Sequence, residues 1–217
     1  MKLDKNTYGT VALIYVLSAA AIVLLVCLVD QWWIKWPLVF VLLWLCGWQT
    51  FFHMVPDRKP VGSDHIVSSV SDGKVVLVEP CFEKVFLNRE SIMISVYMDF
   101  WDIHANFWPL TGTVSFARYY PGKHMLAFKP KASEENEHFC TVIRNDEGKE
   151  VLFKQLAGGF ARRIVCYAKP GLEVEAGRQC GIIKFGSRID YYLPADAKVL
   201  VKVGEKVNAV SSIIAEI

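Results

Sequence analysis

A glycine–serine pair near the C-terminal end, Gly186–Ser187, is the first feature of this chain that could do chemistry. It stands in the run "FGSRID", between an apolar segment and a charged Arg-x-Asp, with no histidine or acid directly beside it to activate the serine. Glycine has no side chain to block an approach and tolerates strained backbone angles. The Ser187 hydroxyl could therefore attack the preceding carbonyl and form an ester.

Such an ester leads to a group that can replace an organic cofactor. Elimination leaves dehydroalanine, which hydrolyses to a pyruvoyl group with loss of ammonia. The pyruvoyl ketone forms a Schiff base with a substrate amine and withdraws electrons from the α-carbon, so that a carboxylate there leaves as carbon dioxide. A lone Gly-Ser pair is usually only a turn, so this prediction depends on the rest of the sequence.

The elements that must position the pair begin with two apolar segments. Residues 11–29 carry no charge, and this length can cross the roughly 30 Å core of a bilayer as a helix. Residues 32–52 form a second segment with aromatic residues at both ends, as at the two headgroup levels. We predict a transmembrane or membrane-inserted helical hairpin over residues 1–52 and a second domain over residues 53–217.

The charges around the hairpin predict its orientation. Both outer ends lie on one side of the bilayer, and they carry Lys2, Lys5, Arg58 and Lys59. Because Lys and Arg are enriched on the cytoplasmic side, we expect the second domain at the cytoplasmic face of the cell membrane. The whole chain has 24 Lys and Arg against 22 Asp and Glu, a balance that argues against a nucleic-acid partner.

The cysteines and histidines predict no metal site. The six cysteines contain no C-x-x-C pair, and the five histidines form no ligand pair at helical or strand spacing. In a cytoplasmic domain the thiols are expected to stay reduced.

From about residue 61 onward the pattern is of short strands. Runs such as "SIMISVYM" and "GTVSFARYY" are rich in β-branched and aromatic residues and are bounded by Gly, Pro or Asp. A G-x-x-V half-repeat at residues 171–176 recurs at residues 204–209. It resembles small β-sandwich domains that carry lipoyl or biotinyl groups, but lacks their Asp-Lys-Ala or Met-Lys-Met. We predict a mainly β domain, sandwich-like or barrel-like.

Several motifs together resemble the phosphatidylserine decarboxylase family, in particular its short bacterial form. In the family's order they are "SDGKV" (71–75), "PGK" (121–123), "KASEENE" (131–137), "ARRIVCY" (161–167) and "KFGSRIDYYLP" (184–194). The resemblance covers residues 50–217. It implies a carboxy-lyase that converts phosphatidylserine to phosphatidylethanolamine at the membrane surface, with a pyruvoyl group and without metal or pyridoxal phosphate.

The resemblance also implies a self-cleaved chain. Ser187 matches the serine that becomes the pyruvoyl group and forms the Schiff base with the substrate, and Gly186 supplies the carbonyl on the other side of the cut. Cleavage gives a β chain, 1–186, and an α chain, 187–217, which stay together as a heterodimer because the cut lies inside one sheet. A higher oligomer is left open.

Two further residues match family positions, and one does not. Asp72 matches an acid that acts with a histidine and the serine in self-processing, and His104 matches the family's first histidine, a candidate for proton transfer in decarboxylation. Longer members have a second histidine where this chain has Phe107. Either His104 serves both steps, or processing relies on backbone strain and Asp72.

The substrate phosphate has a candidate partner in Arg162 or Arg163, because guanidinium groups match phosphate geometry. Successive strand residues face opposite sides, so at most one of the two is expected to point into the site. A related serine lipid, such as an archaetidyl lipid, would undergo the same headgroup chemistry.

Two alternatives predict an intact chain. A non-enzymatic β-sandwich adaptor tethered by the hairpin would leave "FGSRID" without a role. A family member that has lost self-processing is favoured only by Phe107.

Overall fold

The computed structural model describes residues 1–61, 65–127, 132–159, 163–184 and 187–217. The chain divides into two compact units, Met1–Pro56 and Asp57–Ile217, and each is treated by itself.

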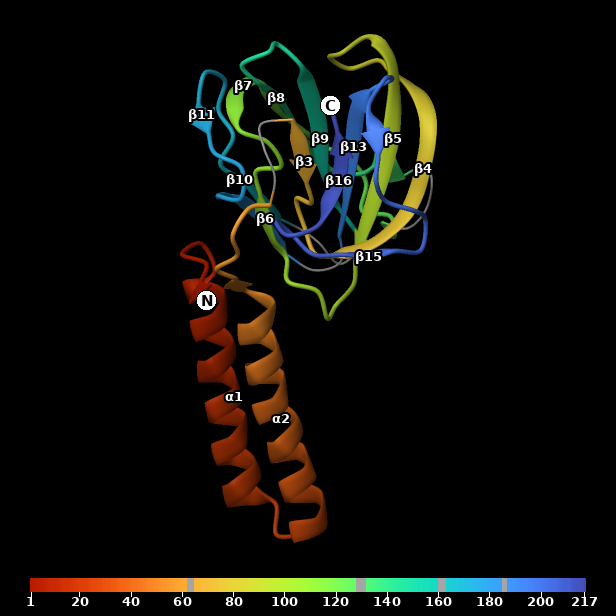
Figure 1. Cartoon of the computed structure of the whole chain (residues 1–217). Helices are drawn as coiled ribbons and strands as arrows, with labels where there is room; N and C mark the ends of the chain where they lie inside the picture. Colours follow the sequence, from red (N-terminus) through yellow and green to blue (C-terminus); the bar gives the residue numbers. More distant parts are fainter. Residues whose placement is uncertain (62–64, 128–131, 160–162, 185–186) are drawn as a thin grey trace. The chain divides into compact units, whose positions relative to one another are not determined.

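The first unit is a pair of apolar helices, α1 (Tyr8–Leu28) and α2 (Trp32–Phe52), which run antiparallel and are shown in red and orange in Figure 1. Their outer ends are joined by a short antiparallel pair of strands, β1 (Lys2–Leu3) and β2 (Met54–Val55). Apolar side chains cover both helices on nearly all sides, as is typical of helices in an apolar surrounding. Both are long and apolar enough to cross a membrane by length and composition.

The second unit is built on one antiparallel sheet of eight strands, which curls in Figure 1. Its strand order is β11-β7-β8-β9-β13-β5-β4-β15. The strands are β4 (Gly73–Glu83), β5 (Arg89–Met98), β7 (Gly112–Tyr120), β8 (His138–Arg144), β9 (Glu150–Ala157), β11 (Glu173–Val174), β13 (Ser187–Pro194) and β15 (Lys206–Val207).

Two three-stranded sheets pack against this sheet. One has the order β10-β12-β6, and the other has the order β14-β16-β3. Their strands are β3 (Ile66–Ser68), β6 (Ala105–Phe107), β10 (Arg163–Cys166), β12 (Gln179–Lys184), β14 (Lys198–Val199) and β16 (Ile213–Glu216). The helix α3 (Ala132–Glu135) is one turn long and falls within "KASEENE", a run whose sequence predicts a helical turn or a loop.

The core fills the space between the three sheets. On the inner face of β13, Ile189 and Tyr191 are fully buried, and they share one cluster with Val67 of β3, Ile183 of β12 and Ile214 of β16. Burial of such side chains is the main stabilising contribution, roughly 25 cal/mol per Å² of apolar surface. The prediction of a mainly β domain preceded by an apolar helical pair is confirmed.

The outer face of β13 is buried as well. Arg188, Asp190 and Tyr192 point to this side, and Tyr192 belongs to a second apolar cluster against which Phe86 and Phe116 pack. The central strand is therefore covered on both faces, although it alternates in polarity.

The two half-repeats form the two edge strands of the large sheet. Gly171 and Gly204 have φ values of 82° and 95°, a left-handed conformation that favours glycine. Val174 in β11 and Val207 in β15 are buried. In both copies, a tight turn at the glycine is followed by an inward-pointing valine.

Candidate active site

Ser187 is the first residue of the central strand β13 and is fully buried. Its backbone position lies between Met98 at the end of β5 and Ala157 at the end of β9. Its Oγ donates a hydrogen bond to Met98 Sδ at 3.0 Å. Gly186 lies outside the described residues, and so does the predicted cleavage bond.

His104 is also fully buried and lies just before β6. The amide of Ile183 in β12 donates to its carbonyl oxygen at 3.2 Å, so the pairing of β12 extends as far as His104. Because β12 ends at Lys184, a short connection joins this point to Ser187. The chain topology thus brings the two predicted residues to the same region.

The orientation of the His104 ring follows from a neighbouring contact. Its Nδ1 lies 2.8 Å from the carbonyl oxygen of Asp102. A carbonyl oxygen only accepts hydrogen bonds, so Nδ1 carries the proton, and Nε2 is the basic nitrogen of the neutral ring.

A hydrogen bond between two buried amide side chains indicates the direction in which the His104 side chain points. Gln155 Nε2 on β9 donates to Asn106 Oδ1 on β6 at 2.8 Å, across the space between the two sheets. Side chains alternate along a strand, so His104 and Asn106 face the same way, as do Gln155 and Ala157. We infer that His104 faces the end of the large sheet where Ala157 pairs with Ser187.

Asp72 lies at the same end of the sheet, two strands away from Ser187. It precedes β4, and both Lys74 of β4 and Arg188 of β13 pair with Tyr97 of β5. The strands β4 and β13 therefore begin at nearly the same position along β5, one on each side of it.

The carboxylate of Asp72 is held by two partners that the sequence did not reveal. Arg58 forms an ion pair with both carboxylate oxygens: Nη2 donates to Oδ2 at 2.9 Å, and Nη1 contacts Oδ1. The amide of Ala209 donates to Oδ1 at 2.7 Å. The sequence indicates Arg58 only as a charge that orients the hairpin, because nothing in its local sequence points to a partner that far along the chain.

Asp102 adds a titratable group beside His104. Burial raises its pKa to about 6, the amide hydrogen bond from Asp99 opposes this shift, and the charges of Asp99 and Asp72 add to it.

We expect Asp102→Asn to raise the free energy of unfolding at about pH 7.5 and to leave it nearly unchanged near pH 4. Because the pKa of Asp102 is higher in the folded protein than in the unfolded chain, ionisation of Asp102 lowers the free energy of unfolding as the pH rises from about 4 to about 6. Asparagine cannot ionise, so the variant does not lose this stability. The carboxyl is partly exposed, so solvent screening limits the gain to about 1 kcal/mol. Thermal unfolding of both proteins across this pH range measures it, and an equal gain at both pH values would contradict it.

The two candidate arginines for the lipid phosphate lie at the edge of the described region. Arg162 lies outside the described residues. The backbone of Arg163 begins β10 and pairs with Lys184, but its side chain is not described. The assignment of one of them to the lipid phosphate stays a prediction.

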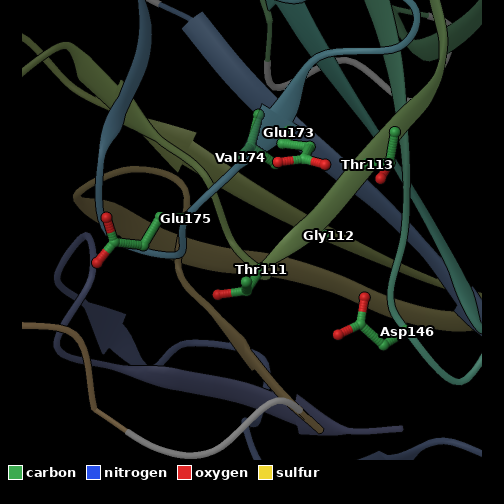
Figure 2. Close-up of a pocket in the computed structure, with 7 residues that line it drawn as sticks. All are labelled: Thr111, Gly112, Thr113, Asp146, Glu173, Val174 and Glu175. Atoms are coloured by element: carbon green, nitrogen blue, oxygen red, sulfur yellow. The ribbon is translucent and has the colours of Figure 1, made fainter.

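A pocket of about 430 Å³ lies elsewhere, and Figure 2 shows its lining. It is formed by Thr111, Gly112, Thr113, Asp146, Glu173, Val174 and Glu175. Asp146 lies between β8 and β9, at the opposite end of β9 from Ala157 and Ser187. Because it lies at the opposite end of the sheet from Ser187, this pocket is not the candidate site. Within the described ranges, no group of three His, Cys, Asp or Glu side chains could hold a metal ion.

Ser187, His104 and Asp72 have the side-chain types that act as nucleophile, base and orienting carboxylate in enzymes. The chain belongs to the phosphatidylserine decarboxylase family. The family model described as phosphatidylserine decarboxylase matches residues 47–215.

Curated relatives agree with this family. A protein of Amoebophilus asiaticus is 41% identical over 170 residues, which cover 78% of this chain and 76% of the relative. A protein of Parabacteroides distasonis is 41% identical over 158 residues, or 73% and 72% of the two chains. A Burkholderia cenocepacia protein is 37% identical over 203 residues, or 94% and 92%. Each is called a phosphatidylserine decarboxylase proenzyme. The predicted family is confirmed, and family membership disfavours the non-enzymatic adaptor.

Proposed function

We propose that this chain is a proenzyme that cuts itself between Gly186 and Ser187, and that the resulting pyruvoyl group decarboxylates phosphatidylserine to phosphatidylethanolamine at the membrane surface. The observation that carries the proposal is the burial of Ser187 at the start of β13, in the region of His104. The word proenzyme in the relatives' names supports a processed form.

Self-processing begins when the Ser187 hydroxyl attacks the carbonyl carbon of the preceding residue. The hydroxyl proton passes to a base, and His104 Nε2 is the candidate. The amide C–N bond between residues 186 and 187 then breaks, the departing nitrogen takes up that proton, and an ester joins residue 186 to Ser187 Oγ. Removal of the Ser187 α-proton then breaks the Cβ–Oγ bond, and residue 186 leaves as a carboxylate. Addition of water to the dehydroalanine releases ammonia and leaves the keto group.

The residues present fit a pyruvoyl group at position 187. Ser187 is fully buried, and its hydroxyl is held by Met98 rather than by bulk water. The group would supply a ketone that binds the substrate amine as a Schiff base and accepts the electron pair left by departing carbon dioxide. The buried His104 would donate a proton to the substrate α-carbon, and the dry surroundings of both residues would exclude competing hydrolysis.

Asp72 is assigned to self-processing as a fixed negative charge. Because Arg58 and the Ala209 amide hold both of its oxygens, the carboxylate keeps one position. The Arg58 guanidinium offsets part of the negative charge of Asp72, and the remainder favours the protonated, cationic form of a nearby histidine. This would help His104 to hold a proton between the two steps.

The helical hairpin supports action at a membrane. Its two helices are long and apolar enough to span a bilayer, and the substrate's acyl chains remain in the same bilayer. Confinement of enzyme and substrate to one surface raises their effective concentration. The flanking Lys and Arg residues support the cytoplasmic side.

An intact-mass spectrum of the purified full-length chain and of Ser187→Ala tests the proposal. We expect two wild-type chains, with the smaller one beginning at position 187 and lighter by one ammonia than simple hydrolysis would give. Ser187→Ala should remain one chain. The wild-type protein should release carbon dioxide from phosphatidylserine in detergent micelles, and Ser187→Ala should not. A single wild-type chain without activity would overturn the proposal, and a faster reaction with an archaetidyl serine lipid would change the substrate.

A further inference from the structure

The strand that begins with Ser187 carries a buried ion pair immediately after it. Arg188 is 2% exposed and Asp190 is fully buried, on the outer face of β13. Arg188 Nε lies 2.8 Å from Asp190 Oδ1, and Nη2 donates to Oδ2 at 3.0 Å. This is a two-point contact between a planar guanidinium and a carboxylate.

The same guanidinium is bound to the connection between β7 and β8. Its Nη1 donates to the carbonyl oxygen of Ala127 at 2.8 Å, and its Nη2 contacts the hydroxyl of Ser133 on α3. On the other side, Asp190 Oδ1 accepts a hydrogen bond from Ser95 on β5 at 2.6 Å. The pair thus joins β13 to its neighbour β5 and to two residues of the β7–β8 connection, Ala127 and Ser133.

Stability alone is a weak explanation for this arrangement. Two charges taken out of water lose hydration free energy, and apolar residues of similar size often stabilise such a position equally well. A buried network of ionic contacts and hydrogen bonds instead restricts the groups that it joins to one arrangement. The position that Arg188 fixes most directly is that of the residue before it.

Residue 187 needs this support only after the proposed cut. In the uncut chain it is held covalently on both sides. After the cut it would be a chain end, and chain ends fray unless they are tied down. Arg188 is the first side chain after that end, and alternation along β13 places it on the face opposite to that of residue 187.

We propose that the Arg188–Asp190 pair is a positioning device that holds the new end of the α chain, so that the keto group stays in the region of His104. The pair does not touch the substrate, and it acts through the backbone of β13. This inference rests on the proposed function.

Kinetics of the cut enzyme test the role. We expect Arg188→Lys and Asp190→Asn to be processed within about threefold of the wild-type rate. Their kcat per pyruvoyl group should fall by roughly 10- to 100-fold, because small displacements of a reacting group have effects of that size. The KM for phosphatidylserine should change less than about twofold, since no substrate contact is lost. Lysine keeps the charge but loses the two-point geometry.

A matched control is Arg144→Gln. Arg144 forms an ion pair with Glu150 at 2.7 Å, but it is exposed and lies at the opposite end of the large sheet from Ser187. This variant should keep the wild-type kcat and KM.

Hydrogen exchange supplies a readout independent of activity. Amides of residues 188–193 should exchange faster in Arg188→Lys than in wild type when the chain is cut. In the uncut Ser187→Ala background, the same substitution should change their exchange little. A purely structural role predicts equal loss of protection in both forms.

The outcomes separate this inference from the proposed function. An uncut, inactive wild-type chain overturns both. A cut, active wild type with unchanged kcat in the Arg188 and Asp190 variants overturns the positioning role alone. Variants that fold but remain uncut would place the action of the pair before the cleavage and also overturn it.

Discussion

Replacement of His104 by glutamine is expected to lower decarboxylation by a factor of about 10² to 10⁴, the usual contribution of a general acid or base. Glutamine is a polar residue of similar length that can occupy the space of the histidine, although it does not place a donor where His104 Nδ1 contacts the Asp102 carbonyl oxygen. Glutamine has no basic nitrogen to replace Nε2, so the fold should survive while proton transfer is lost. The measurement is carbon dioxide release per pyruvoyl group in detergent micelles.

His138 offers a control with the same local geometry. Its Nδ1 lies 2.7 Å from the carbonyl oxygen of Asn136, also two residues earlier, and it stacks on Tyr120. Burial lowers the pKa of His138. His138→Gln should retain the wild-type rate. Wild-type activity in His104→Gln would remove His104 from the reaction.

The same His104 variant decides which group is the processing base. If its chain remains uncut, one histidine serves both self-processing and decarboxylation. If it is cut at a normal rate, processing relies on backbone strain and on the fixed charge of Asp72. The intact mass of the freshly purified variant distinguishes the two.

Gly181→Ala is expected to lower the free energy of unfolding by about 3 kcal/mol, at the upper end of the usual cost of overpacking. A Cβ at this position would overlap the carbonyl oxygen of Val165 and lie 3.1 Å from Gln155 Nε2. The Val165 oxygen belongs to the paired strand β10, so it cannot move without breaking the β10-β12 ladder. The thermal midpoint should fall by roughly 10 °C.

Gly148→Ala separates the contact from a backbone effect. Gly148 has a φ of 78°, but no atom lies within 4 Å of the place that an alanine Cβ would take. Alanine should therefore cost only the left-handed conformation, about 1 kcal/mol. Equal losses at both glycines would contradict the proposed clash. Because β12 leads to the cleavage site, Gly181→Ala should also slow self-processing, whereas Gly148→Ala should not.

The fold class could be predicted because β-branched runs and turn residues report on local structure directly. "SIMISVYM" does form part of β5, but its alternation suggests burial of one face only. Ser91 and Ser95 are buried too, on the outer face. The residues that cover this outer face include Phe116 of β7, which is distant in the sequence, so no local pattern in β5 indicates the cover.

The site was only partly predictable for the same reason. Ser187, His104 and Asp72 could be predicted as site residues because each stands in a short motif. The ion pair between Arg58 and Asp72 and the network around Arg188 join residues far apart in sequence, so local motifs do not predict them. The sequence does not predict that both charged residues of the Arg-x-Asp run after Ser187 are buried, because arginine and aspartate are usually exposed to solvent.

The central place of β13 in the sheet bears on how the protein can regain its structure after denaturation. β13 pairs with β5 on one side and with β9 on the other, so a cut at its first residue would make the middle of the sheet a separate polypeptide. Refolding of the uncut chain is a first-order process that does not depend on protein concentration. Refolding of the cut protein would be second-order, slower on dilution, and dependent on the short chain finding a gap between two strands. Such a protein would fold efficiently once, before its cleavage, and its later persistence would rest on slow unfolding.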